Sequence, residues 1–171
     1  MIPTNPELSK QQSIATFMRL LQRAEVYLDP ELMIFRYAHH LGELLLKYSQ
    51  GGSKVDQALE AHPTLLVEIG KFKADLEIEL SILNRRFSEK SAILGQQFKK
   101  RGGKADELGI KPTNDATEDY KSTDQTWLEF QQSLTVAKAL DDYLGSIIEG
   151  LQQRKDTLVQ RSINRRNRSE G

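Results

Sequence analysis

The chain of 171 residues contains no cysteine, so disulfide bonds, thiolate metal ligands and a cysteine nucleophile are excluded. It has only three histidines. His39 and His40 are adjacent, so on a helix their side chains diverge by about 100° and cannot chelate one metal ion together. His62 precedes a proline. The sequence therefore predicts no metal site, and we expect no cofactor.

Long apolar runs and an excess of one charge are also missing. No stretch approaches the roughly 20 apolar residues that a membrane-spanning helix needs. The first residues, Met1-Ile-Pro-Thr-Asn, lack the basic and apolar regions of a secretory signal. We therefore expect no membrane association and a cytoplasmic location. The 24 basic and 24 acidic residues balance, so only the distribution of charge along the chain is informative.

Only five prolines occur, and they separate long segments. Because no segment alternates between apolar and polar residues with the period of a strand, the pattern predicts helices alone. One helix is expected over 6–28, and a second from Asp29-Pro30 to Gly51-Gly52. A short helical turn over 55–61 is expected to end before Pro63.

Two much longer helices are predicted in the rest of the chain. Over 64–101 apolar residues follow the three- and four-residue steps of a coiled coil, interrupted by Lys73 and Lys90. A loop is expected over 102–115. Over 117–167 the apolar positions repeat every seven residues: Phe130, Ala137, Leu144, Leu151 and Leu158.

The expected architecture is all-α, with an antiparallel hairpin of the two long helices and two further N-terminal helices beside it. The predicted division is an N-terminal helical region over 1–62 and the hairpin over 63–171. A helix of about 50 residues would span about 75 Å, so the last helix should extend beyond its partner. The apolar stripe on that extension predicts self-association.

Charge is sorted along the chain into basic and acidic stretches. From Arg85 to Lys104 the net charge is +6, with Glu89 as the one acid. From Gln152 to Gly171 the net charge is +4. Such clusters can bind a nucleic-acid backbone by releasing its counterions. The alternative is that these cations lie at the C-terminal ends of helices and only stabilise the helix dipole. The candidate nucleic-acid-binding residues are Arg85, Arg86, Lys90, Lys99, Lys100, Arg101 and Lys104.

Catalytic motifs are not found. The stretch from Lys99 to Lys104, with Gly102 and Gly103, lacks the spacing of a nucleotide-binding P-loop and follows a helix, whereas a P-loop follows a strand. A glycine-rich end of a helix explains the glycines. No nucleophile or acid–base pair with an orienting partner can be identified, so we expect a protein that is not an enzyme.

Residues 65–171 resemble the UvsY-type recombination mediators of bacteriophages. The resemblance rests on a long helix ending in a basic, glycine-containing turn, on the segment from Glu118 through Trp127 to Phe130, on Ala139–Arg154, and on the basic stretch from Ser162 to Gly171. The family's basic contact residues correspond most closely to Arg85 and Arg86. Phe87-Ser88 stands here where the family has a tyrosine pair.

The resemblance implies a helical homo-oligomer, assembled as a ring, that binds single-stranded DNA. It would help to load a RecA-like recombinase onto strands covered by single-strand-binding protein, in the host cytoplasm if the chain is phage-encoded. Subunit contacts would come from the last helix, through Leu144, Ile148, Leu151 and Leu158. The alternative function is a non-catalytic structural or scaffolding protein of a virion or tail assembly, whose charges only solvate a coiled coil.

Overall fold

A computed structural model describes residues 6–37 and 55–169, with side chains placed in 15–37, in 62–164 and at Asn167. Within these ranges all regular structure is helical and no strand occurs, which confirms the predicted all-α class. The described helices are α1 (Pro6–Tyr27), α2 (Met33–Arg36), α4 (Val55–Lys99), α5 (Lys104–Glu107), α6 (Asn114–Lys121) and α7 (Gln125–Ser169).

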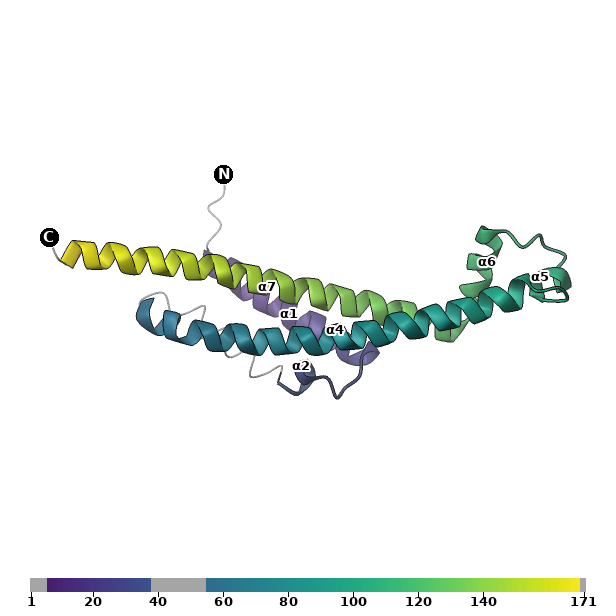
Figure 1. The fold of residues 1–171 in the computed structure, drawn as a ribbon, viewed down its shortest axis with the longest axis horizontal. Coiled ribbons are helices and arrows are strands. Elements are labelled where there is room, and N and C mark those ends of the chain that lie inside the picture. The colour runs from purple at the N-terminus through teal and green to yellow at the C-terminus, as the bar shows by residue number, and fades with distance from the viewer. Residues whose placement is uncertain (1–5, 38–54, 170–171) are drawn as a thin grey trace.

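The long helices α4 and α7 lie side by side, run in opposite directions and form an elongated rod (Figure 1). Their facing apolar stripes make the centre of the core. Leu76 on α4 and Leu140 and Leu144 on α7 are completely buried in it. The predicted seven-residue repeat of α7 faces inward, since Ala137, Leu144, Leu151 and Leu158 are all buried and Phe130 is half-buried.

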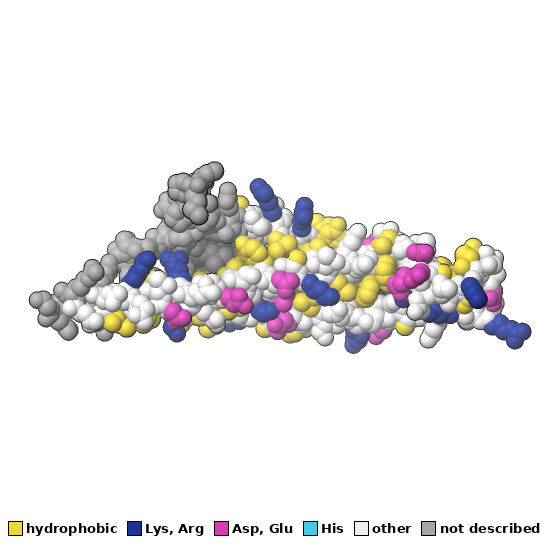
Figure 2. All heavy atoms as spheres, turned by 90° about the horizontal axis from the view of Figure 1, so that it is seen from above, with side chains coloured by type: hydrophobic (Ala, Val, Ile, Leu, Met, Phe, Trp, Pro, Cys, Tyr) yellow, Lys and Arg dark blue, Asp and Glu magenta, His cyan; other side chains and the backbone are white. Residues whose placement is uncertain are grey.

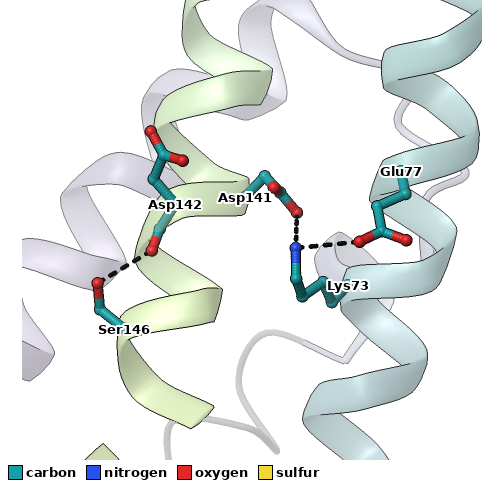
Figure 3. Close-up of polar contacts among 5 residues, drawn as sticks. All are labelled: Lys73, Glu77, Asp141, Asp142 and Ser146. Carbon is teal, nitrogen blue, oxygen red and sulfur yellow. Dashed lines mark hydrogen bonds and ion pairs between the residues drawn. The ribbon is translucent and has the colours of Figure 1, made fainter. Parts of the chain in front are cut away.

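Two ion pairs join α4 to α7 within this seam. Lys73 Nζ lies 2.5 Å from Asp141 Oδ1 and 3.1 Å from Glu77 Oε1 (Figure 3). Lys90 Nζ lies 2.9 Å from Asp124 Oδ2. The two lysines are 17 positions apart, as are the two aspartates. The lysines that interrupt the apolar pattern of α4 are therefore each matched by an acid, Asp141 within α7 and Asp124 directly before it.

The helix α1 covers one side of α7. Phe17, Leu21, Ala24 and Leu28 are buried, and the ring of Phe17 stacks on that of Tyr143 with centroids 5.3 Å apart. Removal from water raises the pKa of the Tyr143 phenol. The first predicted helix, over 6–28, therefore agrees with α1 to within one residue.

The short helix α2 is tied to α4 instead. Ile34 is buried, and the backbone N–H of Met33 donates to Asp75 Oδ2 at 2.8 Å. The predicted helix start at Asp29-Pro30 is wrong: Asp29 Oδ1 accepts a hydrogen bond from Glu31 N at 2.8 Å, forming a turn, and the helix begins at Met33. The rest of that predicted helix, including His39 and His40, lies outside the described residues.

The expected interruption at Pro63 is also wrong, because α4 begins at Val55 and continues through this proline. Proline removes one backbone hydrogen bond from a helix interior and crowds the preceding turn. Here Pro63 is exposed, while its neighbours His62 and Leu65 are buried. Burial on both sides of the proline holds the helix together, and the predicted 62/63 boundary falls inside one continuous element.

The predicted helix over 117–167 is divided into α6 and α7, which are separated at Ser122–Asp124. Asp124 starts α7: its Oδ1 accepts a hydrogen bond from Trp127 N at 2.9 Å, as an N-cap does. Its other carboxylate oxygen holds Lys90. These contacts, with the Lys90 hydrogen bond as the largest cause, lower the pKa of Asp124.

At the opposite end of the rod, α7 continues past the described start of α4 (Figure 1). Lys73 faces Asp141, so the 18 positions from Lys73 back to Val55 correspond to the 18 positions from Asp141 forward to Val159. Residues 160–169 of α7 therefore extend beyond the described part of α4, as the sequence predicted.

Candidate nucleic-acid interface

The basic turn that follows α4 is built around two glycines. Gly102 has a φ of 70°, a conformation that residues with a Cβ rarely adopt. A Cβ on Gly103 would come within 2.6 Å of the Lys100 carbonyl oxygen. Asp106 Oδ2 accepts a hydrogen bond from Gly102 N at 2.6 Å. The glycines and this carboxylate end α4 and position Lys99, Lys100 and Arg101 at the tip of the rod.

The helix α6 then folds back along the last turns of α4. The rings of Phe98 and Tyr120 stack with centroids 5.1 Å apart, and Thr117 is buried beside Gly95. A groove of about 620 Å³ remains between the two helices. Lys99 and Lys121 both line it, although they are distant in the sequence.

Three of the predicted cations, all lysines, have polar partners within 3.3 Å in the described part of the chain. Lys90 is half-buried on Asp124, and Lys104 Nζ lies 2.5 Å from Glu107 Oε2. The hydrogen bond with Glu107 raises the pKa of Lys104. Lys99 Nζ donates to Asn114 Oδ1 at 3.3 Å. A phosphate group at Lys90 would have to replace an existing carboxylate, which makes it the weakest candidate.

The predicted pair Arg85 and Arg86 is exposed on α4, but the two side chains have different surroundings. Arg85 Nε lies 3.8 Å from Glu89 Oε1, a long contact between exposed groups. Such a pair contributes little and is easily exchanged. Arg86 instead lines a groove with the acids Asp29, Glu79 and Glu129. Arg85 is therefore the more accessible of the two.

The tip carries less net charge than the linear count suggested. The structure brings α5 and α6 against the end of α4, and over residues 99–121 six cations stand beside five acids. Lys121, which the sequence reasoning did not select, lies in the groove and is itself paired with Glu118 at 2.7 Å. Lys100 and Arg101 are exposed at the very end.

The aromatic residues that could stack on bases are used internally. Phe98 and Trp127 are buried, and the rings of Phe87 and Trp127 contact each other with centroids 5.4 Å apart. Among the described residues, no acceptor is found for the buried Trp127 Nε1. Tyr48 lies outside the described residues. Any nucleic-acid contact along this part of α4 must therefore come mainly from cations.

The second basic stretch has a different setting. Between Gln152 and Ser169, all of it in α7, six cations stand against Asp156 alone. Arg161 is exposed and lies beyond the described start of α4, as do positions 165, 166 and 168, which are also arginines. Helical backbone thus carries four arginines past the end of the neighbouring long helix (Figure 1).

Comparison of the chain with protein-family models, with curated proteins and with solved structures finds no match.

The interface residues expected on the last helix are largely internal to one chain. Leu144 is completely buried in the core, and Leu151 belongs to the same cluster. Leu158 is buried as well, and Ile148 is half-buried against the core. Because α1 and α4 already cover that stripe of α7, Leu144 and Leu151 have little surface left for a contact between subunits. Val159 and Ile163, further along α7, are more exposed.

Within the described ranges, no group of three or more His, Asp or Glu side chains is arranged to hold a metal ion. Nor is any of the described helices long and apolar enough to cross a membrane.

Proposed function

We propose that this chain is a non-catalytic helical protein that binds single-stranded DNA and acts as a homo-oligomer. The observation that carries the proposal is the extension of α7, where positions 161, 165, 166 and 168 are all arginine beyond the described part of α4. A helix that leaves the bundle with one sign of charge suits a polyanion, whose counterions it displaces.

The tip of the rod supplies a second, weaker contact. Arg85, Lys100 and Arg101 are exposed on α4 and in the turn after it, while Lys90 and Lys104 are engaged by acids. Each cluster alone would bind weakly. An oligomer would present several copies of both clusters to one strand, and the effective concentration of each further contact would raise the affinity.

The biological role within this proposal comes from the resemblance to UvsY-type mediators. We propose that the oligomer, as a ring in that family's manner, loads a RecA-like recombinase onto single strands covered by single-strand-binding protein. The arginines of the α7 extension support the first step of that role, binding to the strand.

Fluorescence anisotropy with a labelled single-stranded oligonucleotide tests the binding step. Changing Arg161, Arg165, Arg166 and Arg168 to Gln should weaken binding and flatten the salt dependence. Each lost phosphate contact lowers the slope of log K against log salt by about 0.7. Lys138→Gln, an exposed cation in the middle of α7, is the control and should change neither quantity.

Binding that is equal in the wild type and in the four-arginine variant would reject the α7 extension as the binding site. Absence of binding at low salt by the wild type would reject the DNA-binding proposal as a whole. A parallel variant, Lys100→Gln with Arg101→Gln, measures the contribution of the tip, for which we expect a smaller loss.

A scaffolding function is the second candidate, and the charge balance at the tip favours it. Over 99–121 most of the positive charge is offset by acids, as in a solvated end of a helical rod. If the wild type and the arginine and lysine variants above form the same oligomer and none binds single- or double-stranded DNA, the scaffolding function replaces DNA binding.

A further inference from the structure

The outer face of α1 is exposed although it is partly apolar. Val26 is 75% exposed and Tyr27 is 40% exposed, both at the C-terminal end of the helix. Figure 2 shows hydrophobic side chains gathered along the middle of the molecule, next to projecting basic side chains. Exposed apolar residues that form a continuous patch often mark a contact with another protein.

Two shallow grooves meet at Val26 and Tyr27, and they differ in charge. The first runs along α1, and its described lining includes Arg19 and Arg23 and no acid. The ion pairs among the described residues include neither of these arginines. One end of the patch is therefore positively charged, and no acid among the described residues pairs with its two arginines.

The second groove lies on the other side of Val26 and Tyr27, between the end of α1 and the two long helices. Its volume is about 750 Å³, and Asp29, Glu79 and Glu129 line it against one cation, Arg86. Burial, followed by repulsion from Asp29, raises the pKa of Glu79. A cation placed in this groove would relieve that repulsion.

In the sequence these charges are placed symmetrically about Val26, with Arg23 in α1 and Asp29 in the turn after it. Arg23 precedes Val26 by three residues and Asp29 follows it by three. If a second copy is placed with its α1 antiparallel to the first, Arg23 of each copy comes opposite Asp29 of the other. Arg19 lies about 6 Å further along, given a helical rise of 1.5 Å per residue, and reaches the groove of Glu79 and Glu129.

We propose that two copies of this chain pair about a two-fold axis at Val26 and Tyr27, with the α1 arginines of each copy bound in the acidic groove of the other. A two-fold contact requires a surface that is complementary to itself. An apolar centre with opposite charges on its two sides meets that requirement. The pairing does not depend on DNA binding, and it gives self-association a surface other than the buried stripe of α7.

A cysteine substitution tests the axis directly, because the chain has no cysteine of its own. A residue on a two-fold axis lies beside its own copy, so Val26→Cys should oxidise to a covalent dimer on a non-reducing gel. Disulfide formation needs Cα atoms within about 7 Å. Ile78→Cys, on the exposed face of α4 and 63% exposed, is the control and should cross-link far more slowly.

Complementary charge reversal tests the partner surfaces. The variant Arg19→Glu with Arg23→Glu and the variant Glu79→Lys with Glu129→Lys should each pair about 100-fold more weakly, because like charges then face each other. A mixture of the two should recover pairing, since both contacts of a mixed pair join opposite charges. Glu25→Lys, on α1 but outside both grooves, should pair like the wild type.

Sedimentation velocity, with circular dichroism to confirm helical content, reads out the association. A wild type that is monomeric at tens of micromolar would overturn the proposal and leave this face to a different partner. Equal cross-linking of Val26→Cys and Ile78→Cys would also overturn it, as would variants that associate like the wild type. DNA binding that is lost while pairing persists would reject only the proposed function.

Discussion

Individual charged side chains specify how α4 and α7 align. Lys73 and Asp141 are each about three-quarters buried, and their hydrogen bond is the main cause that raises the pKa of Lys73. A half-buried lysine in an apolar seam is stable only when an acid faces it. Together with Lys90 and Asp124 at the same 17-residue interval, this pair matches only one antiparallel register.

A double-mutant cycle measures this pair. Lys73→Met and Asp141→Leu should each destabilise the fold, because Lys73→Met leaves the Asp141 carboxylate unpaired in the seam and Asp141→Leu leaves Lys73 with Glu77 alone. The double variant should be less destabilised than the sum, with a coupling energy of about 1 kcal/mol in urea unfolding. Lys71→Met, which removes an exposed pair with Glu68, is the control. Strict additivity at Lys73 and Asp141 would contradict the assigned role.

His62 is a second residue whose charge state matters. It is 3% exposed near the start of α4. Burial is the main cause that lowers its pKa from the ordinary value of 6.5, and the cations Lys155 and Arg154 on α7 lower it further. The neutral imidazole therefore suits the fold, and the imidazolium does not.

The sign of the pH effect follows from this shift. Below pH 6.5 the unfolded chain binds a proton at His62 before the folded chain does, so the free energy of unfolding falls as the pH is lowered. His62→Gln should lose this component and show a flatter decline between pH 7 and pH 5 in urea unfolding. Identical pH profiles for the two proteins would show that His62 makes no such contribution.

At the scale of the helices, α4 continues through Pro63, although a proline in the sequence usually predicts the end of a helix. Leu65, Ile69 and Phe72 follow Pro63 on the buried side of α4. A proline in a helix interior costs about 3 kcal/mol. Burying three large apolar side chains stabilises the fold by more than that. Burial of His62 and Leu65 on either side of Pro63 therefore stabilises a helix that the proline alone would tend to end.

Replacing the proline should strengthen this end of the helix. Pro63→Ala restores a backbone donor and removes the clash of the ring with the preceding turn. We expect slower hydrogen exchange of the amides over 55–62, while the amides of α6 exchange as before. Faster hydrogen exchange over 55–62 in the variant would mean that Pro63 stabilises this end of α4.

At the scale of the whole molecule, the rod has a well-packed centre and a C-terminal extension whose described side chains lie outside the core. The described core residues of α7 end at Leu158, while residues 160–169 extend beyond the described part of α4. Stability and the proposed DNA contact are thus located on different parts of the same helix.

Truncation after Gln160 should reduce DNA binding while leaving the stability of the fold nearly unchanged. The free energy of unfolding should change by less than about 1 kcal/mol, since surface segments outside the core contribute little. Affinity for a single-stranded oligonucleotide should fall by at least tenfold at low salt, because four arginines are removed. A truncated chain that unfolds much more easily would show that the extension packs on the fold.

The sequence by itself determined the all-α class and the inward stripe of α7, because apolar spacing is a local property of a helix. It could not determine that α4 passes through Pro63, that Leu144 and Leu151 are covered within one chain, or that acids neutralise Lys90 and Lys104. Those outcomes depend on which distant residues meet. A buried neighbour or an opposing carboxylate decides whether the same side chain is core, ion pair or free surface.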